Sequence, residues 1–249
     1  MTLENLIKDA DKLATDAAAL AHGLRGLLPV APPDPVVGYN LAAARYLEGK
    51  KLTLPVNEAG ELKGRAREIM PDALMSFSGP YFSIDGQVIT FACPPKGATT
   101  ATAKYPRTEL KYLKEFSVKE PWSDTIYLSI DQLAEGQKVV IHQIHDANEP
   151  WVKIVADAKG AFIRLRALIK QTDGAPDTEQ LLSAGQIRLG EILGSNLDWN
   201  PAKKQLTCAI TGVGKSVTMN RLGKGGKAYG KAGAYVQGGT YGVKLRHYV

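Results

Sequence analysis

Three short stretches of the sequence carry polar residue types that could act together on one acidic ligand. These are Arg107, Glu109 and Lys111, then Gln143 and His145, and finally the stretch from Tyr229 to Gln237. Side chains of an extended strand alternate between two faces, so every second residue shares a face. If each stretch is a strand, its charged and polar side chains therefore point the same way.

The third stretch is the most informative of the three. As a strand it places Tyr229, Lys231, Gly233, Tyr235 and Gln237 on one face, and its glycines disfavour a helix. Glycine in a strand often marks a site where a ligand or another backbone approaches closely. The stretch is thus a candidate binding floor, and the alternative is a glycine-rich, solvated edge strand.

Arg107 and Glu109 would lie side by side on the face of an extended segment. An Arg held by a neighbouring Glu can present its guanidinium to a carboxylate in two-pronged fashion. The alternative is an exposed ion pair on a strand, which would contribute little to stability. Both interpretations remain open on these residues alone.

The stretch Gln143-Ile144-His145 closes an apolar run that begins at Val139. Strand alternation puts Gln143 and His145 on one face and His142, with Val140 and Ile144, on the other. One of the two histidines is then packed and hydrogen-bonded in or near the core. We predict this structural role for His142.

The elements that position these residues are mostly short strands separated by turn residues. Asp85-Gly86 between two apolar runs is a strong hairpin signal. The pattern predicts strands at 51–55, 81–84, 87–91, 125–133, 138–145, 151–156, 162–169, 186–193, 205–210, 216–221, 229–237 and 240–248. Such a series indicates an antiparallel sandwich or barrel, and the lack of a strand–helix–strand rhythm argues against Rossmann and TIM-barrel folds.

The N-terminal segment differs from the rest of the chain. A heptad-like apolar stripe from Leu3 to Leu27 predicts a helix over 2–28, followed by a stiff Pro-rich linker over 29–35. The helix is a candidate for self-association through a coiled coil. The alternative is an amphipathic helix packed on the body of the protein, since three Ala-rich heptads make a weak zipper.

Composition narrows the classes of function. The chain has 249 residues, 44% of them hydrophobic, and a formal net charge of +6, which favours an anionic partner such as nucleic acid, anionic lipid or an acidic polymer. No run is long and apolar enough to cross a membrane, and no secretory signal is visible. The lack of an apolar run means that membrane insertion is not expected. A nucleic-acid binder would need aromatic platforms interleaved with basic residues, so nucleic acid is not expected as a partner either.

Two further features could suggest a cofactor. Cys93 and Cys208 either form a disulfide or are two buried thiols, and neither has a partner at zinc-ligand spacing, so no metal is expected. The run from Gly212 to Ser216 resembles part of a phosphate loop, but Ala209 stands where that loop needs Gly. A strand rather than a helix is predicted to follow it, so we expect no nucleotide and no other cofactor.

Taken together, the three stretches resemble the signature motifs of a known enzyme family. Arg-Thr-Glu-Leu, Gln-Ile-His and Tyr-x-Lys-x-Gly-x-Tyr-x-Gln, in this order, are similar to those of polysaccharide lyase family 7, the alginate lyases. The resemblance covers about Gly38 to Val249 and includes Leu52-Thr53-Leu54-Pro55. It implies two parts, an N-terminal helical extension and linker over 1–35 and a lyase domain over 36–249.

The resemblance implies an all-β, antiparallel jelly-roll sandwich whose concave sheet forms a groove for an acidic polysaccharide. The family's reaction is β-elimination at a 4-linked uronic acid, which leaves a 4,5-unsaturated sugar at the new end. The family's motif places the catalytic residues at Arg107, Gln143, His145 and Tyr235, and the groove contacts at Glu109, Lys111, Tyr229, Lys231 and Gln237. The Gln-Ile-His form implies acceptance of guluronate-containing blocks, and endo action is expected.

These assignments agree with the chemistry of the reaction. Removal of the C5 proton of a uronate moves negative charge onto its carboxylate, where Arg107 and Gln143 would stabilise it. For mannuronate Tyr235 could serve as both base and acid, because the proton and the leaving group lie on one side of the ring. For guluronate they lie on opposite faces, so His145 is the expected base and Tyr235 the acid.

Two residues depart from the family pattern, and two other functions stay open. Lys111 stands where the family often has Arg, and Gly230 where it often has Phe. The alternatives are a lyase for another polyuronate such as glucuronan, and a non-catalytic jelly roll that binds acidic polysaccharides. The substrate makes a secreted protein expected, extracellular or periplasmic; the chain would then be a trimmed mature form or use another export route.

Overall fold

The structure is a computed structural model that describes residues 41–160, 162–213, 215–222 and 226–249. The predicted N-terminal helix and Pro-rich linker, and the self-association that depended on them, lie outside the described residues. The helix, the linker and the self-association stay predictions.

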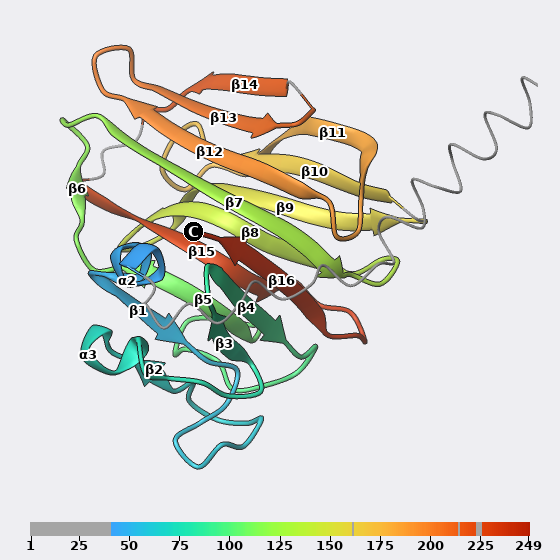
Figure 1. The fold of residues 1–249 in the computed structure, drawn as a ribbon. Helices are drawn as coiled ribbons and strands as arrows, with labels where there is room; N and C mark the ends of the chain where they lie inside the picture. Colours follow the sequence, from blue (N-terminus) through green and yellow to red (C-terminus); the bar gives the residue numbers. More distant parts are fainter. Residues whose placement is uncertain (1–40, 161, 214, 223–225) are drawn as a thin grey trace, which may run out of the picture. The chain divides into compact units, whose positions relative to one another are not determined.

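The first layer of the fold is a nine-stranded antiparallel sheet, which we call the site sheet (Figure 1). Its order is β11-β10-β9-β8-β15-β5-β1-β2, with the short β6 paired to β15. The strands are β1 Lys50–Thr53, β2 Glu68–Ile69, β5 Arg107–Tyr112, β6 Phe116–Ser117, β8 Lys138–Asp146, β9 Pro150–Lys159, β10 Phe162–Ile169, β11 Thr178–Arg188 and β15 Lys227–Val236.

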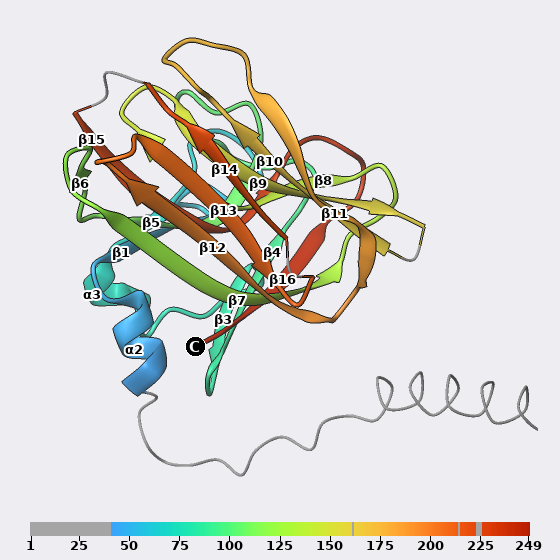
Figure 2. The same cartoon turned by 90° about the horizontal axis from the view of Figure 1, so that it is seen from above.

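The second layer is a seven-stranded antiparallel sheet in the order β14-β13-β12-β7-β16-β4-β3. Its strands are β3 Phe82–Asp85, β4 Val88–Cys93, β7 Trp122–Gln132, β12 Ile192–Asn200, β13 Gln205–Thr211, β14 Lys215–Asn220 and β16 Val243–Tyr248. Two short helices, α2 Leu41–Leu47 and α3 Pro71–Leu74, lie near β1 (Figures 1 and 2). Two antiparallel layers with this strand order form the predicted jelly-roll sandwich, so the expected fold class is confirmed.

The hydrophobic core fills the space between the two sheets. Along β9 and β10 every second residue is buried in it, as in Val152, Ile154 and Ala156 of β9. Such period-two burial leaves the alternate residues of the site sheet on its outer face. Trp151 of β9 and Trp199 of β12 meet edge to face across the two layers, with ring centres 5.5 Å apart.

Most predicted strands are present, and the Asp85-Gly86 hairpin joins β3 to β4 as expected. Gly86 has φ +56°, a left-handed conformation that glycine adopts without steric cost. The predicted 229–237 strand is β15, which lies between β5 and β8 in the middle of the site sheet. The edge-strand alternative for this stretch is therefore wrong. In the run from Gly212 to Ser216, residues 212–213 form a turn and Lys215 begins strand β14, so no helix follows.

The predicted strand at 186–193 is wrong. The chain instead forms two strands, β11 and β12, joined by a turn over 189–191. Gly190 reverses the chain with φ +79°, and the apolar residues Leu189 and Ile192 that suggested a continuous strand are exposed. Both strands were missed because their inward apolar residues are separated by Gly, Ser, Asn and Gln.

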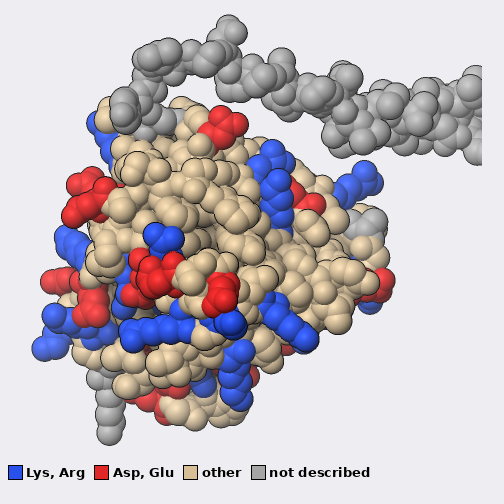
Figure 3. All heavy atoms as spheres, turned by 90° about the horizontal axis from the view of Figure 1, so that it is seen from below, with Lys and Arg blue, Asp and Glu red and all other residues tan. Residues whose placement is uncertain are grey.

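One face of the described surface shows mixed charge. On the face drawn in Figure 3, Lys and Arg side chains lie next to Asp and Glu side chains rather than in one basic field. Among the described residues no helix is long and apolar enough to cross a membrane.

The two cysteines are free and buried, Cys93 on β4 and Cys208 on β13. Burial raises the pKa of both thiols to about 12, so neither is a reactive thiolate at neutral pH. This resolves the alternatives in favour of two thiols.

We predict that a thiol reagent labels two groups per chain only after denaturation. Reducing agent should leave the melting temperature unchanged, because no disulfide constrains the fold. Labelling counted by mass spectrometry, with and without denaturant, checks this. Recovery of a mass two hydrogens lower from the denatured, unreduced protein would contradict it.

Candidate active site

The centre of the candidate site is the carboxylate of Glu109 on β5, whose side chain is only 3% exposed. Arg107 Nη1 lies 3.1 Å from Glu109 Oε2, and Gln143 Nε2 donates to Oε1 at 2.5 Å. Lys231 Nζ lies 4.0 Å from Oε2. Three neighbouring strands, β5, β8 and β15, thus bring three of the predicted residues together around a fourth, the buried acid Glu109.

The charges of this cluster do not balance. Arg107 and Lys231 carry two positive charges against the single negative charge of Glu109, and all three side chains are nearly buried. Buried charges are stable only when they are paired and hydrogen-bonded, so the surplus favours a second anion. The cluster is therefore suited to receive a carboxylate from a ligand.

Tyr235 is held by Arg107. The guanidinium carbon of Arg107 lies 3.9 Å from the centre of the Tyr235 ring, a cation–π contact. The two residues are direct partners in the pairing of β15 with β5. Tyr235 is half-buried, so its hydroxyl remains within reach of a ligand.

His145 pairs with Tyr229, so along β15 it lies on the side of Glu109 away from Tyr235, and its ring is fixed through Nδ1. That nitrogen donates to the main-chain oxygen of Asp146, which assigns the proton to Nδ1 and leaves a lone pair on Nε2. The ring stacks on Tyr229 at 5.6 Å and 16°. Burial, followed by the charge of Lys231, lowers the pKa of His145 to about 4. The imidazole is therefore neutral at neutral pH and can accept a proton.

Two more groups near His145 have shifted pKa values. Burial lowers the pKa of Lys231 to about 8, against the opposing effect of Glu109. Burial and then Glu109 raise the pKa of Tyr229 to about 12, so its hydroxyl stays neutral. Tyr229 Oη lies 3.4 Å from His145 Nδ1, and Lys111 Nζ lies 3.8 Å above the Tyr229 ring. Tyr229 thus separates Lys111 from His145.

Gln237 is the predicted residue that the structure does not bring into this cluster. It follows the end of β15, where its N–H donates to the main-chain oxygen of Lys138 at 2.8 Å. Tyr229, Lys231, Gly233 and Tyr235, by contrast, pair with the site residues of β5 or β8 and share their face. The predicted common face is confirmed for these four.

Gly233 has a different role from the one expected. A Cβ there would lie 2.5 Å from the main-chain oxygen of Thr108, and φ is +140°. The close approach that requires glycine is that of strand β5, not of a ligand. Near this position β8 and β15 shift register, so Val140 pairs with Tyr235. Val140 therefore lies on the site face, and its predicted place beside His142 is wrong because strand alternation does not survive a bulge.

His142 has the structural role predicted for it. It is fully buried, with Nε2 3.0 Å from Asp124 Oδ2 and Nδ1 3.1 Å from Ser195 Oγ. Asp124 Oδ2 also accepts from the Tyr112 hydroxyl at 2.5 Å. Sequence reasoning missed Asp124, Ser195 and Tyr112, since nothing in their local sequence shows that four strands bring them together.

At Gly230, where the family often has Phe, neighbouring aromatic rings occupy the space of the missing side chain. A Cβ on Gly230 would lie 2.8 Å from the ring of Tyr112 and 2.9 Å from that of Trp122. These two rings fill the space that a residue-230 side chain would take. Beneath the site sheet, Tyr112 thus packs against β15 and bonds to the opposite sheet.

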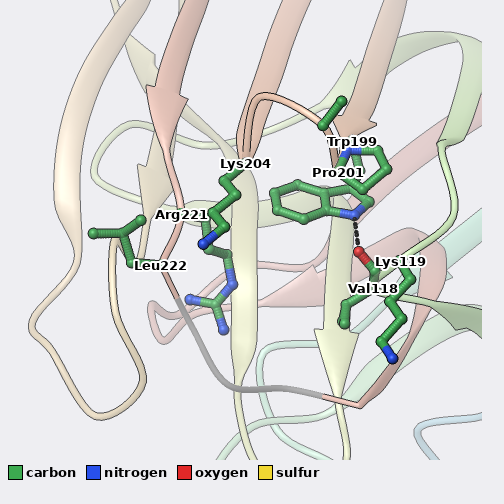
Figure 4. A pocket seen from close by; sticks show the side chains of 8 residues that line it. Val118, Lys119, Trp199, Pro201, Lys204, Arg221 and Leu222 are labelled. Atoms are coloured by element: carbon green, nitrogen blue, oxygen red, sulfur yellow. Dashed lines mark hydrogen bonds between the residues drawn. The ribbon is translucent and has the colours of Figure 1, made fainter.

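A pocket among the described residues lies away from the candidate site. It has a volume of about 460 Å³ and is lined by Val118, Lys119, Trp199, Pro201, Ala202, Lys204, Arg221 and Leu222 (Figure 4). Trp199 Nε1 donates to the oxygen of Val118 at 3.0 Å, and Arg221 Nη2 binds Asp173 at 2.8 Å. None of the predicted site residues lines it. In the described ranges no group of three or more His, Cys, Asp or Glu side chains is placed to hold a metal ion.

Solved structures share this fold. An alginate lyase from Klebsiella pneumoniae matches with a TM-score of 0.70 at 18% identity, over 84% of this chain and 96% of that chain. An alginate lyase from Pseudomonas aeruginosa matches with a TM-score of 0.69 at 20% identity, over 81% of this chain and 96% of that chain. The family 7 alginate lyase A1-II′, as a doubly substituted variant in complex with the substrate GGMG, matches with a TM-score of 0.69 at 22% identity, over 85% of this chain and 95% of that chain. No curated protein matches the chain closely enough to count as a relative.

The two-sheet jelly roll carries a basic, tyrosine-bearing face, and a match to a family model places the protein in the class of the polysaccharide lyases. The family model described as alginate lyase matches residues 47–247, which is most of the chain. The chain belongs to this family, the alginate lyases of polysaccharide lyase family 7. The family resemblance carried by the three motifs is thus confirmed.

We predict that Gly230→Phe destabilises the fold by about 1–3 kcal/mol, because the new ring overpacks the space of Tyr112 and Trp122. Denaturant unfolding followed by fluorescence measures this. Gly226→Ala is the matched control, since a Cβ at Gly226 meets nothing within 4 Å. Equal stability of Gly230→Phe and wild type would show that the two rings can move aside freely.

Proposed function

We propose that this protein cleaves alginate by β-elimination, that it acts at bonds inside the polysaccharide rather than at its ends, and that it accepts guluronate-containing blocks. The observation that carries this proposal is the unbalanced cluster of Arg107 and Lys231 around buried Glu109, flanked by a neutral histidine and a tyrosine. The family match and the substrate complex of A1-II′ support alginate as the polymer. Secretion to the extracellular space or periplasm is part of the same proposal.

In this scheme the substrate carboxylate binds at the cluster. Arg107 and Lys231 supply positive charge, and the second N–H of Gln143, whose first is bonded to Glu109, donates to a carboxylate oxygen. As the C5 proton leaves, negative charge grows on that carboxylate in a partly dry site. Fixed donors and charges there stabilise the transition state more than they would in water.

The proton transfers then fall to His145 and Tyr235. For guluronate, Nε2 of His145 takes the C5 proton, a double bond forms between C4 and C5, and the C4–O4 bond breaks. The hydroxyl of Tyr235 gives its proton to the departing O4. In the strand pairing Glu109 lies opposite Gly233, with Tyr235 further along β15 in one direction and Tyr229, the partner of His145, in the other. Placement on either side of Glu109 suits a substrate whose proton and leaving group lie on opposite faces.

For mannuronate the same tyrosine would act as base and then as acid. A tyrosine base needs nearby positive charge, and the guanidinium 3.9 Å from its ring supplies it. Site-sheet strands extend on both sides of the centre, β9 to β11 on one and β1 and β2 on the other. This favours binding in the middle of a polymer, and hence endo action.

The decisive test is the growth of ultraviolet absorbance from unsaturated uronates on polyguluronate, polymannuronate, mixed alginate and glucuronan, with product sizes measured. We expect oligomeric products from polyguluronate and mixed alginate. Activity on glucuronan alone would replace alginate by another polyuronate. No absorbance from any of the four would favour a non-catalytic, polysaccharide-binding jelly roll.

We predict that Tyr235→Phe lowers kcat by about 10² to 10⁴, because the leaving oxygen loses its general acid. His145→Gln should lower kcat on polyguluronate far more than on polymannuronate, if histidine is the base only for guluronate. Initial rates on both polymers check the two variants. A Tyr235→Phe variant with near wild-type rates would refute the assignment, as would equal effects of His145→Gln on both polymers.

The pH dependence should reflect the two shifted groups. His145 must be unprotonated to act as base, so kcat/KM on polyguluronate should hold between pH 6.5 and 5 and fall only toward its pKa of about 4. Lys231 binds the substrate anion when charged, so KM should rise above its pKa of about 8. Lys231→Arg should remove the rise in KM, and an acid limb near pH 6.5 would contradict the assignment to His145.

A further inference from the structure

Five polar residues lie in register across five adjacent strands of the site sheet. The pairings Lys51–Lys111, Lys111–Lys231, Lys231–Gln143 and Gln143–Lys153 join β1, β5, β15, β8 and β9 in one row. Four of the five are lysines. We call this set the lysine row.

The row faces outward on the same side as Glu109. The residues next to it in sequence, such as Leu52, Leu110 and Ala232, are fully buried in the core, so alternation turns the lysines away from it. Lys231 and Gln143 both belong to the row and to the cluster around Glu109. The row therefore passes through the centre of the candidate site, at right angles to the strands.

The folded chain alone gives no reason for such a row. Like charges placed directly opposite each other on neighbouring strands destabilise a sheet, and here Lys51, Lys111 and Lys231 follow one another. Within the described residues Lys111 has no ion-pair partner, and its ammonium lies over the Tyr229 ring. An anionic ligand with several charges at regular intervals would remove this repulsion.

The spacing of the row fits one such ligand. Neighbouring strands lie about 4.8 Å apart, which is close to the rise per sugar of a 1,4-linked pyranose chain. A polyuronate that crosses the strands would place about one carboxylate per strand. Its successive carboxylates would then meet successive members of the row.

The outer lysines differ from the inner two. Lys51 Nζ lies 2.7 Å from Glu68, and Lys153 Nζ lies 2.6 Å from Asp177. All four of these side chains are partly exposed, and ion pairs of this kind contribute only about 0–1 kcal/mol. A substrate carboxylate can therefore take the place of Glu68 or Asp177 at small cost.

We propose that the lysine row binds consecutive carboxylates of a polyuronate lying across the strands, with Lys51 and Lys153 forming two outer subsites whose affinity Glu68 and Asp177 reduce. This rests on the proposed function, because it assigns the path of the substrate through that site. Short oligomers occupy the centre alone, and longer ones gain the outer lysines.

The test is a calorimetric measurement of the binding of oligouronates of increasing length to protein that carries Tyr235→Phe, in which slow cleavage does not disturb the binding measurement. In that background Lys51→Gln and Lys153→Gln should each weaken hexamer binding by about three- to fivefold and leave trimer binding unchanged. Lys244→Gln, at an exposed lysine on β16 of the opposite sheet, is the matched control and should change neither.

Removal of a competing acid should act in the opposite direction. Asp177→Asn frees Lys153, so hexamer binding should tighten by up to about fivefold, and this gain should vanish when Lys153→Gln is present. Hexamer binding that is unchanged by both Lys51→Gln and Lys153→Gln overturns the row, even if the wild-type protein cleaves alginate. Equal weakening of trimer and hexamer also overturns it, because the lysines would then act on the site as a whole.

The outcome separates the two proposals. If length-dependent binding follows the lysines while the wild-type protein forms no unsaturated product, the row stands and the proposed cleavage fails. If cleavage occurs and binding ignores both outer lysines, the cleavage stands and the row fails.

Discussion

The buried carboxylate of Glu109 is the constraint on which the rest of the site depends. A lone carboxylate at 3% exposure would cost several kcal/mol in lost hydration, and breaking such a pair typically costs about 3–5 kcal/mol. Its partners Arg107, Gln143 and Lys231 come from three strands. Glu109 therefore fixes the positions of the charged groups relative to one another before any substrate arrives, and Arg107 in turn fixes Tyr235.

The reverse side of the same three strands is held just as firmly. Tyr112 of β5 and His142 of β8 both bond to Asp124 of β7, while the Tyr112 ring packs against Gly230 of β15. The polar network thus ties the strands of the site to the opposite sheet. The two departures from the family pattern have physical counterparts here. On the core side of the site sheet Tyr112 and Trp122 fill the space next to Gly230, and on the outer side the Lys111 ammonium lies over the Tyr229 ring.

Sequence patterns predicted the fold where local signals and tertiary contacts agree. The alternation of apolar and polar residues predicted the positions of most strands. The Asp85-Gly86 pair predicted one hairpin, in which Gly86 adopts a left-handed backbone conformation. They failed at 186–193, where a run of apolar residues crosses a turn at Gly190 and two side chains face solvent. Alternation also failed at Val140, because the register shift between β8 and β15 depends on how two strands meet.

The sequence by itself determined which residues could do the chemistry, since residue type and two-residue spacing decide what shares a strand face. It also determined the family, because the three motifs and their order can be read from the sequence without knowing how the chain folds. Only the tertiary structure decided that Glu109 joins the three motifs, that His145 is held neutral, and that Gly233 serves the neighbouring strand. Those facts depend on burial and on strand register, which arise from contacts between residues far apart in the sequence.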